Sequence, residues 1–304
     1  MSKLTKVFMI IAVIAIGIVD TVNAQVAINT DGSMPDASAM LDVKSTDKGL
    51  LPPRVAKVSD VSNPVESLLV YEEYNHCLRY YNGSEWSDCM GGETVCPTQL
   101  TDAENNTYNV VRIGSQCWMA ENLNVGIMIN GSNSQSNNDT IEKYCYNDDT
   151  ANCDIYGGLY QWNEMMQYVS DTATKGICPY GWHLPTDTEY KTMEIYLGMT
   201  QTQADATGWR GTDEGSKLAG NEPLWPNGNL DQNANFGTSG FAALPGGARS
   251  TGGVFYDQNT TARLWSSNEY NANAWYRYLN KNNTTVRRGS DDKNLGFSVR
   301  CVKN

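Results

Sequence analysis

Residues 176–190 read GICPYGWHLPTDTEY and contain the clearest helix start in the chain. Thr186 and Glu189 have the spacing of a capping box, in which the two side chains bind free backbone N–H groups at the start of a helix. Tyr190 begins an apolar stripe with helical spacing, and Gly198 is typical of a helix end. We therefore predict a helix that begins at Thr186 and ends at Gly198.

A second helix and several strands are expected around this one. Leu159, Trp162 and Met166 share one helical face, which predicts a helix over about 157–169. Polar and apolar residues alternate around an Asn-Asn turn after residue 95, which predicts a hairpin. Further strands are expected at 262–267, 273–280 and 295–303. Because long Gly- and Asn-rich loops make up the rest, the pattern indicates an α+β domain.

The cysteines predict a disulfide framework. There are eight, all after residue 76, and an even number in an exported chain favours pairing. Their spacing favours the pairs Cys77–Cys89, Cys96–Cys117, Cys145–Cys153 and Cys178–Cys301. The last pair closes a long loop, which in the chain-entropy treatment contributes about 4–5 kcal/mol. Zinc is disfavoured because the chain has no CxxC pair and only two histidines.

The first 24 residues have the pattern of a signal peptide. Lys3 and Lys6 precede an apolar run over 7–19, and small residues at Val22 and Ala24 predict cleavage after Ala24. The run is shorter than the ~18 apolar residues that a membrane span needs, and no later segment is long and apolar enough to span. We therefore expect a secreted or cell-surface protein.

The remaining chain divides into three segments by composition. Residues 25–66 are small, polar and turn-rich, which predicts an extended leader. Residues 67–93 contain short β-rich runs and an Asn-Gly turn, so they predict a small β-hairpin unit or stalk. The main domain is expected over 94–304.

The charge of the chain argues against nucleic acid as a partner. The formal net charge is -12, and no run of basic residues exceeds two. Phosphates would be repelled by such a chain. A glycan or a surface protein is the partner class that we expect instead.

The main domain resembles the Fibrobacter succinogenes major paralogous domain, which is found in many exported proteins of the Bacteroidetes and Fibrobacteres. The resemblance spans nearly all of residues 95–304. It is carried by IGSQCWMAENLN (113–124), YGGLYQW (156–162), GICPYGWHLPTDTEY (176–190), SGFAALPGGAR (239–249), LWSSNEY (264–270), AWYRYL (274–279) and GFSVRCVK (296–303).

More distantly, the domain is similar to formylglycine-generating enzymes and to the C-type-lectin-like fold, through HLPTDTEY and GFSVRCVK. This similarity implies an irregular α+β domain with two main helices, a small twisted antiparallel sheet and long loops. It does not supply the chemistry, because those enzymes use a cysteine pair late in the chain and residues 241–299 contain none. The leader, through SAMLDVKSTDKGLLPPRV (38–55), resembles the N-terminal segment of many Bacteroidetes surface proteins and fibre-like chains.

Aromatic residues in the loop-rich half are the candidates for ligand binding. They are interleaved with asparagine, and aromatic rings offer a large contact area at a low entropic cost. The alternative for each is a place in the core. The candidates are Trp209, Trp225, Trp265, Tyr270 and Trp275.

One loop has the alternating oxygen donors of a calcium site, supplied by Asp231, Asn233 and Asn235. Its glycine comes one position late, and the closing glutamate of such loops is missing. A solvated loop is the alternative. Calcium is the one cofactor that the sequence leaves open.

Three functions remain from these observations. We expect a non-catalytic, adhesin-like binding module that recognises a glycan or a protein, and we assign no catalytic residue. An enzyme of the formylglycine-generating type, or a hydrolase with a carboxylate pair, is the second hypothesis. An architectural fibre subunit, with homo-oligomers formed through the leader, is the third.

Overall fold

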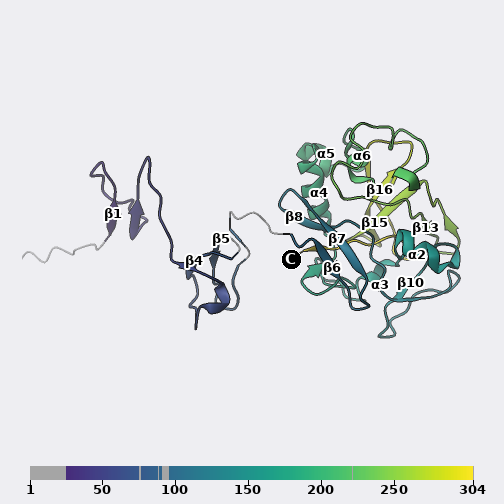
Figure 1. Ribbon diagram of the computed structural model, residues 1–304, viewed down its shortest axis with the longest axis horizontal. Helices are drawn as coiled ribbons and strands as arrows, with labels where there is room; N and C mark the ends of the chain where they lie inside the picture. Colours follow the sequence, from purple (N-terminus) through teal and green to yellow (C-terminus); the bar gives the residue numbers. More distant parts are fainter. Residues whose placement is uncertain (1–24, 75–76, 88, 91–95, 221, 304) are drawn as a thin grey trace, which may run out of the picture. The chain divides into compact units, whose positions relative to one another are not determined.

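The computed structural model describes residues 25–74, 77–87, 89–90, 96–220 and 222–303 (Figure 1). The chain divides into two compact units, residues 1–92 and 93–304, which we call the first unit and the main unit. The expected signal peptide, 1–24, lies outside the described residues. Within the described ranges, no helix is long and apolar enough to cross a membrane.

The first unit contains two small sheets and little core. One sheet is a parallel pair of β1 (Val26–Ile28) and β2 (Leu41–Val43), both within the segment expected to be an extended leader. The other has the order β3-β4-β5, with β3 (Arg54–Val55), β4 (Leu69–Glu72) and β5 (Cys77–Tyr80), and a short 3-10 helix, η1 (Val58–Asp60), lies between β3 and β4. Among the apolar residues described in this unit, only Val70 and Cys77 are buried.

The main unit begins with a five-stranded sheet that joins the two ends of this unit's sequence. Its strand order is β11-β18-β8-β7-β6, so the last strand of the chain lies inside the sheet, between β11 and β8. The members are β6 (Gln99–Thr101), β7 (Thr107–Ile113), β8 (Gln116–Met119), β11 (Trp182–His183) and β18 (Val302–Lys303). The β6–β7 hairpin turns at Asn105, which has a left-handed backbone, as the sequence predicts.

A four-stranded antiparallel sheet with the order β12-β17-β16-β15 forms the second layer. Its members are β12 (Gly208–Arg210), β15 (Thr261–Tyr270), β16 (Asn273–Asn280) and β17 (Val286–Asp292). The expected strand 273–280 is confirmed, and 262–267 lies within β15. Most of the expected strand 295–303 is irregular, because residues such as Phe297 form only single bridges to separate segments.

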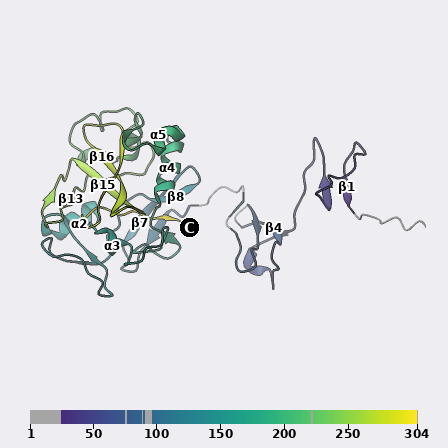
Figure 2. The same cartoon turned by 180° about the vertical axis from the view of Figure 1, so that it is seen from behind.

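The helices are short, and two further strand pairs complete the unit. The pairs are β9 (Ile127–Met128) with β10 (Glu142–Lys143), and β13 (Ala248–Arg249) with β14 (Phe255–Tyr256). The α-helices are α2 (Thr150–Tyr156), α3 (Trp162–Met165), α4 (Asp187–Tyr196), α5 (Gln201–Asp205) and α6 (Glu214–Leu218). The 3-10 helices are η2 (Tyr146–Asp148) and η3 (Glu222–Leu224). Seen from either side, α4 and α5 lie together, away from α2 (Figure 1 and Figure 2). The fold is therefore mixed α+β with few helices and several small sheets.

The predicted helix at 157–169 is wrong, apart from the single turn of α3. The helix in this region lies earlier, in α2, where the Asp149 side chain caps the start by accepting a hydrogen bond from the Ala151 N–H. Gly157 ends α2 with a positive φ of 77°, and a Cβ there would clash with Asn122. Residues 159 and 160 then form bridges to Tyr144 and Phe297, which require extended backbone.

Helix α4 confirms the capping box. The Thr186 hydroxyl accepts from the Glu189 N–H, and the Glu189 carboxylate accepts from the Thr186 N–H at 2.7 Å. The same carboxylate pairs with His183 Nε2 at 2.7 Å. Burial alone would raise the pKa of Glu189, but these hydrogen bonds outweigh it and lower the pKa. The helix therefore begins where the sequence predicts.

Five buried side chains, which we call the charge network, connect α4 to the four-stranded sheet. They are Asp187, Glu194, Arg210, Arg277 and Arg288. Arg277 lies at the centre, where Nη1 contacts Asp187 at 2.8 Å and Nε contacts Glu194 at 2.7 Å. Arg288 binds Asp187 with two nitrogens, and Arg210 Nη2 binds Glu194 at 2.8 Å. Because each carboxylate is shared between two guanidinium groups, the network offsets its desolvation cost.

Two further buried arginines support the loops. Arg300 donates to the carbonyl oxygens of Met119, Phe241 and Ala242. Arg249 donates to those of Gly131, Asn133 and Asn294. Irregular backbone needs partners for its carbonyl groups when it is buried, and these guanidinium groups supply them.

The four disulfides have the pairing that the spacing predicts: Cys77–Cys89, Cys96–Cys117, Cys145–Cys153 and Cys178–Cys301. They account for all eight cysteines of the sequence. The last bond joins the segment before α4 to the residue before β18, 123 positions later. It therefore joins the middle of the main unit's sequence to its end.

We expect Arg277→Met to lower the free energy of unfolding by about 3–5 kcal/mol, because it leaves two buried carboxylates short of a partner. Urea unfolding at neutral pH measures the loss. Arg287→Gln is the control, since Arg287 is exposed on the neighbouring strand and its change should stay within about 0.5 kcal/mol. Equal losses in the two variants would contradict the central role of Arg277.

Acid should weaken the charge network. Burial opposes ionisation of Asp187, but Arg288 and Arg277 outweigh it and lower its pKa from 3.8 to about 2. A depressed carboxylate pKa stabilises the folded state above the unfolded pKa, so this contribution is lost between about pH 4 and pH 2. The urea midpoint should fall in this window, and it should fall less in Asp187→Asn. If the urea midpoint falls equally in both proteins, the acid sensitivity comes from groups other than Asp187.

Candidate functional site

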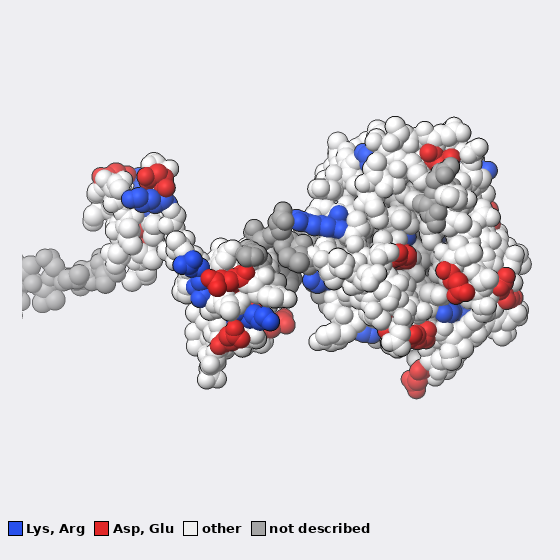
Figure 3. Space-filling view, in the orientation of Figure 1, with Lys and Arg blue, Asp and Glu red and all other residues white. Residues whose placement is uncertain are grey.

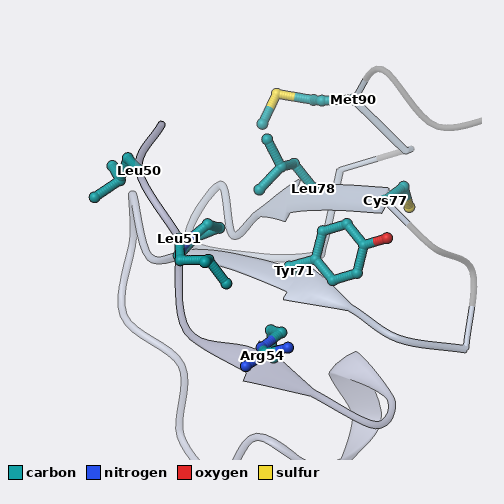
Figure 4. A pocket seen from close by; sticks show the side chains of 8 residues that line it. Leu50, Leu51, Arg54, Tyr71, Cys77, Leu78 and Met90 are labelled. Carbon is teal, nitrogen blue, oxygen red and sulfur yellow. The ribbon is translucent and has the colours of Figure 1, made fainter. Parts of the chain in front are cut away.

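The first unit has an apolar groove of about 550 Å³ (Figure 4). It is lined by Leu50, Leu51, Pro52, Arg54, Tyr71, Cys77, Leu78 and Met90. Leu50 and Leu51 lie within the turn-rich leader and are 65% and 74% exposed. Leu78 of β5 forms a bridge with Met90, and the two side chains lie next to each other on the groove wall.

The exposed apolar residues of the first unit extend well beyond this groove. Thirteen large apolar or aromatic side chains described in this unit are exposed: Val26, Ile28, Met34, Met40, Leu41, Val43, Leu50, Leu51, Val65, Leu69, Tyr74, Tyr80 and Met90. Monomeric proteins rarely leave so much apolar surface in water. The surface is therefore suited to contact with another chain.

The main unit has a different candidate, a row of side chains across one face of the four-stranded sheet. Strand register places Trp209 of β12 opposite Arg287 of β17, Arg287 opposite Tyr278 of β16, and Tyr278 opposite Arg263 of β15. Partners across a sheet lie on the same face. We call Trp209, Arg287, Tyr278 and Arg263 the surface row.

The surface row is held together by ring contacts. The rings of Trp209 and Tyr278 lie 5.2 Å apart between centroids. The Arg263 guanidinium lies 4.7 Å from the Tyr278 ring and 5.0 Å from the ring of Tyr256, and it also binds Asp257 at 2.7 Å. Trp209 is 41% exposed. An aromatic and cationic face of this kind is typical of recognition surfaces.

The five aromatic candidates from the sequence lie in three different places. Trp209 belongs to the surface row. Tyr270 and Trp275 form a separate pair with ring centroids 4.5 Å apart, and Trp275 points to the opposite face of the sheet from Trp209 because side chains alternate along a strand. Trp225 and Trp265 are only 3% and 1% exposed, and each indole N–H donates to a backbone carbonyl. These two are core residues, which corrects their assignment as ligand contacts.

Three residues of the surface row were absent from the sequence candidates. Tyr278 lies in an aromatic motif, but Arg263 and Arg287 have no feature that separates them from other arginines. Only the register of four strands brings them beside Trp209.

The candidate calcium loop is held by its own hydrogen bonds. The Asp231 carboxylate accepts from the Gly228 N–H at 2.6 Å, and the Asn233 side chain accepts from the Asn235 N–H at 2.9 Å. Asn235 donates to Asp213. Among the described residues, no group of three or more His, Cys, Asp or Glu side chains could hold a metal ion. Hydrogen bonds within the chain engage all three side chains, and calcium at this loop stays a prediction.

The carboxylates Glu121 and Glu164, which the hydrolase hypothesis would draw on, have structural partners. Both oxygens of Glu121 accept hydrogen bonds from Asn109, at 2.6 and 2.7 Å, although Glu121 and Asp154 line one polar cavity of about 260 Å³. Glu164 is buried and accepts from Tyr168 and from the Glu142 N–H, and burial raises its pKa. With all eight cysteines in disulfides, no thiol is available for a cysteine-pair mechanism.

Comparison with known proteins gives two family matches. The family model of the Fibrobacter succinogenes major domain matches residues 111–303. The family model of a phage tail like trimerisation region matches residues 27–106. No curated protein and no solved structure matches the chain.

The two tryptophan environments predict different costs of truncation. Trp225→Ala should lower the free energy of unfolding by about 3–5 kcal/mol, because it empties a filled core position. Trp209→Ala should cost about 1 kcal/mol, since it loses mainly the contact with Tyr278. Urea unfolding followed by circular dichroism compares the two. Equal costs would contradict the exposed position of Trp209.

Proposed function

The chain belongs to the Fibrobacter succinogenes major domain family, and on that premise we propose that it is an exported, non-catalytic subunit of a surface assembly. In this proposal the first unit joins copies of the chain into a trimer. The main unit is displayed outward as the part that recognises a glycan or a protein. This combines the architectural and the adhesin-like hypotheses.

The observation that carries the assembly proposal is the imbalance in the first unit. It buries two apolar residues and exposes thirteen large apolar or aromatic ones among its described residues. Fully burying one such side chain contributes about 1.5–3 kcal/mol, so contact with other chains would supply the core that a single copy lacks. The match of residues 27–106 to a trimerisation region supports three copies of this chain as the partners.

Export is supported by the oxidation state of the main unit. Its six cysteines form three disulfides, and such bonds persist in oxidising compartments. The expected signal peptide supports the same location.

A recognition role for the main unit is supported by the surface row. The Trp209 ring and the Arg287 guanidinium of this row are exposed, and they lie on the face of the sheet opposite to the charge network. On the face drawn in Figure 3, the acidic and basic side chains of the described residues are scattered in small groups and form no continuous basic patch. This distribution supports a glycan or protein partner over nucleic acid.

Sedimentation equilibrium of residues 25–304 tests the assembly. We expect a mass of three chains at micromolar concentration, and a single-chain mass for the double variant Leu50→Asp and Leu51→Asp, because two carboxylates would be buried at the contact.

Val254→Asp is the matched control, since Val254 is 67% exposed in the main unit and should leave the trimer unchanged. Circular dichroism checks that each variant is folded. A single-chain mass for the unaltered protein at the highest soluble concentration would refute the assembly proposal.

A further inference from the structure

The surface row contains one charge that has no partner. Among the residues that the structure describes, the exposed Arg287 guanidinium makes no hydrogen bond and no ion pair. Arg263, in the same row, is by contrast held by Asp257 and Thr261. Arg287 is therefore an unpaired positive charge on a chain whose net charge is -12. It offers a planar set of donors to an anion.

Arg287 lies between two aromatic residues. Trp209 and Tyr278 flank it on the neighbouring strands, and their rings meet at 5.2 Å although a strand separates them. The rings therefore lean toward each other across β17, beside the arginine. Tyr278 is fixed by the guanidinium of Arg263 on its other side and by a hydrogen bond from Asn280 to its hydroxyl.

The backbone beneath these side chains is rigid. Arg210, Arg277 and Arg288 of the charge network are the chain neighbours of Trp209, Tyr278 and Arg287, and they point to the buried face. A prearranged surface loses little entropy when it binds a ligand.

We propose that Trp209, Arg287 and Tyr278 form a binding site for an acidic sugar, whose ring packs on the two aromatic rings while its carboxylate pairs with Arg287. The sugar face supplies C–H groups for the rings, and the carboxylate matches the free guanidinium. The inference rests on the proposed recognition role of the main unit and names its ligand class. It does not depend on trimer assembly.

Matched pairs of sugars test the site. Residues 25–304 are titrated calorimetrically with oligomers of galacturonate, glucuronate and mannuronate, with sialyllactose, and with the methyl ester of each. We expect at least one acid to bind. Its ester should bind at least about tenfold more weakly, because the ester cannot form the charge-assisted hydrogen bonds.

Three variants locate the binding. Arg287→Gln should reduce affinity for the acid to that for the ester, and should leave ester binding unchanged. Trp209→Ala should weaken both by about tenfold, since stacking does not depend on charge. Tyr180→Ala is the control, because Tyr180 is 95% exposed elsewhere in the main unit and should change neither.

Several outcomes would overturn the proposal: no acid binds, acid and ester bind equally, or Trp209→Ala and Arg287→Gln bind as the unaltered protein does. The mass of each variant is measured in parallel. If the protein is a trimer but binds no acidic sugar, the binding site is refuted and the assembly proposal is not. If the protein binds an acidic sugar as a single chain, the assembly proposal is refuted and the binding site is not.

Discussion

The pairing of two buried carboxylates with three buried arginines is the constraint on which the main unit depends. Asp187 and Glu194 are both on α4, while the arginines come from three strands of one sheet, so the ion pairs fix the helix against that sheet. The capping box sets where α4 begins, and the Cys178–Cys301 bond fastens the segment that precedes it. The network also fixes the positions of the side chains on the opposite face of the sheet, because each of its arginines is next in sequence to one of them. These neighbours are Trp209–Arg210, Arg277–Tyr278 and Arg287–Arg288.

Local signals in the sequence were sufficient for α4, for β16 and for the four disulfides. They were insufficient where a distant segment decides the conformation. The stripe at 157–169 looks helical, but Tyr160 is required as a bridge partner of Phe297. Strand β17, VRRGSDD, shows no alternation of apolar residues, although Arg288 within it is buried. The charge of Arg288 is paired with Asp187 of α4, a residue far away in the sequence. Periodicity in one segment contains no information about such partners.

The candidate site was limited by the same difficulty. A tryptophan in a Gly- and Asn-rich segment can lie on a ligand-binding surface or in the core. The composition of the neighbouring sequence therefore does not distinguish Trp209 from Trp225. Burial separates them, since the Trp225 indole donates to the Ala243 carbonyl beneath the loops. The two units also differ in kind. The main unit buries an apolar core of its own, whereas the first unit keeps most of its large apolar side chains exposed.

The Cys96–Cys117 bond has a mechanical consequence. Cys96 lies just before β6, an edge strand, while Cys117 lies in β8 at the centre of the five-stranded sheet. Tension that enters the main unit from the preceding chain therefore passes through a covalent bond to the central strand. It does not peel the edge hairpin one hydrogen bond at a time. In the proposed displayed part, such a load would fall on β8, a strand that is paired on both sides, with β7 and with β18.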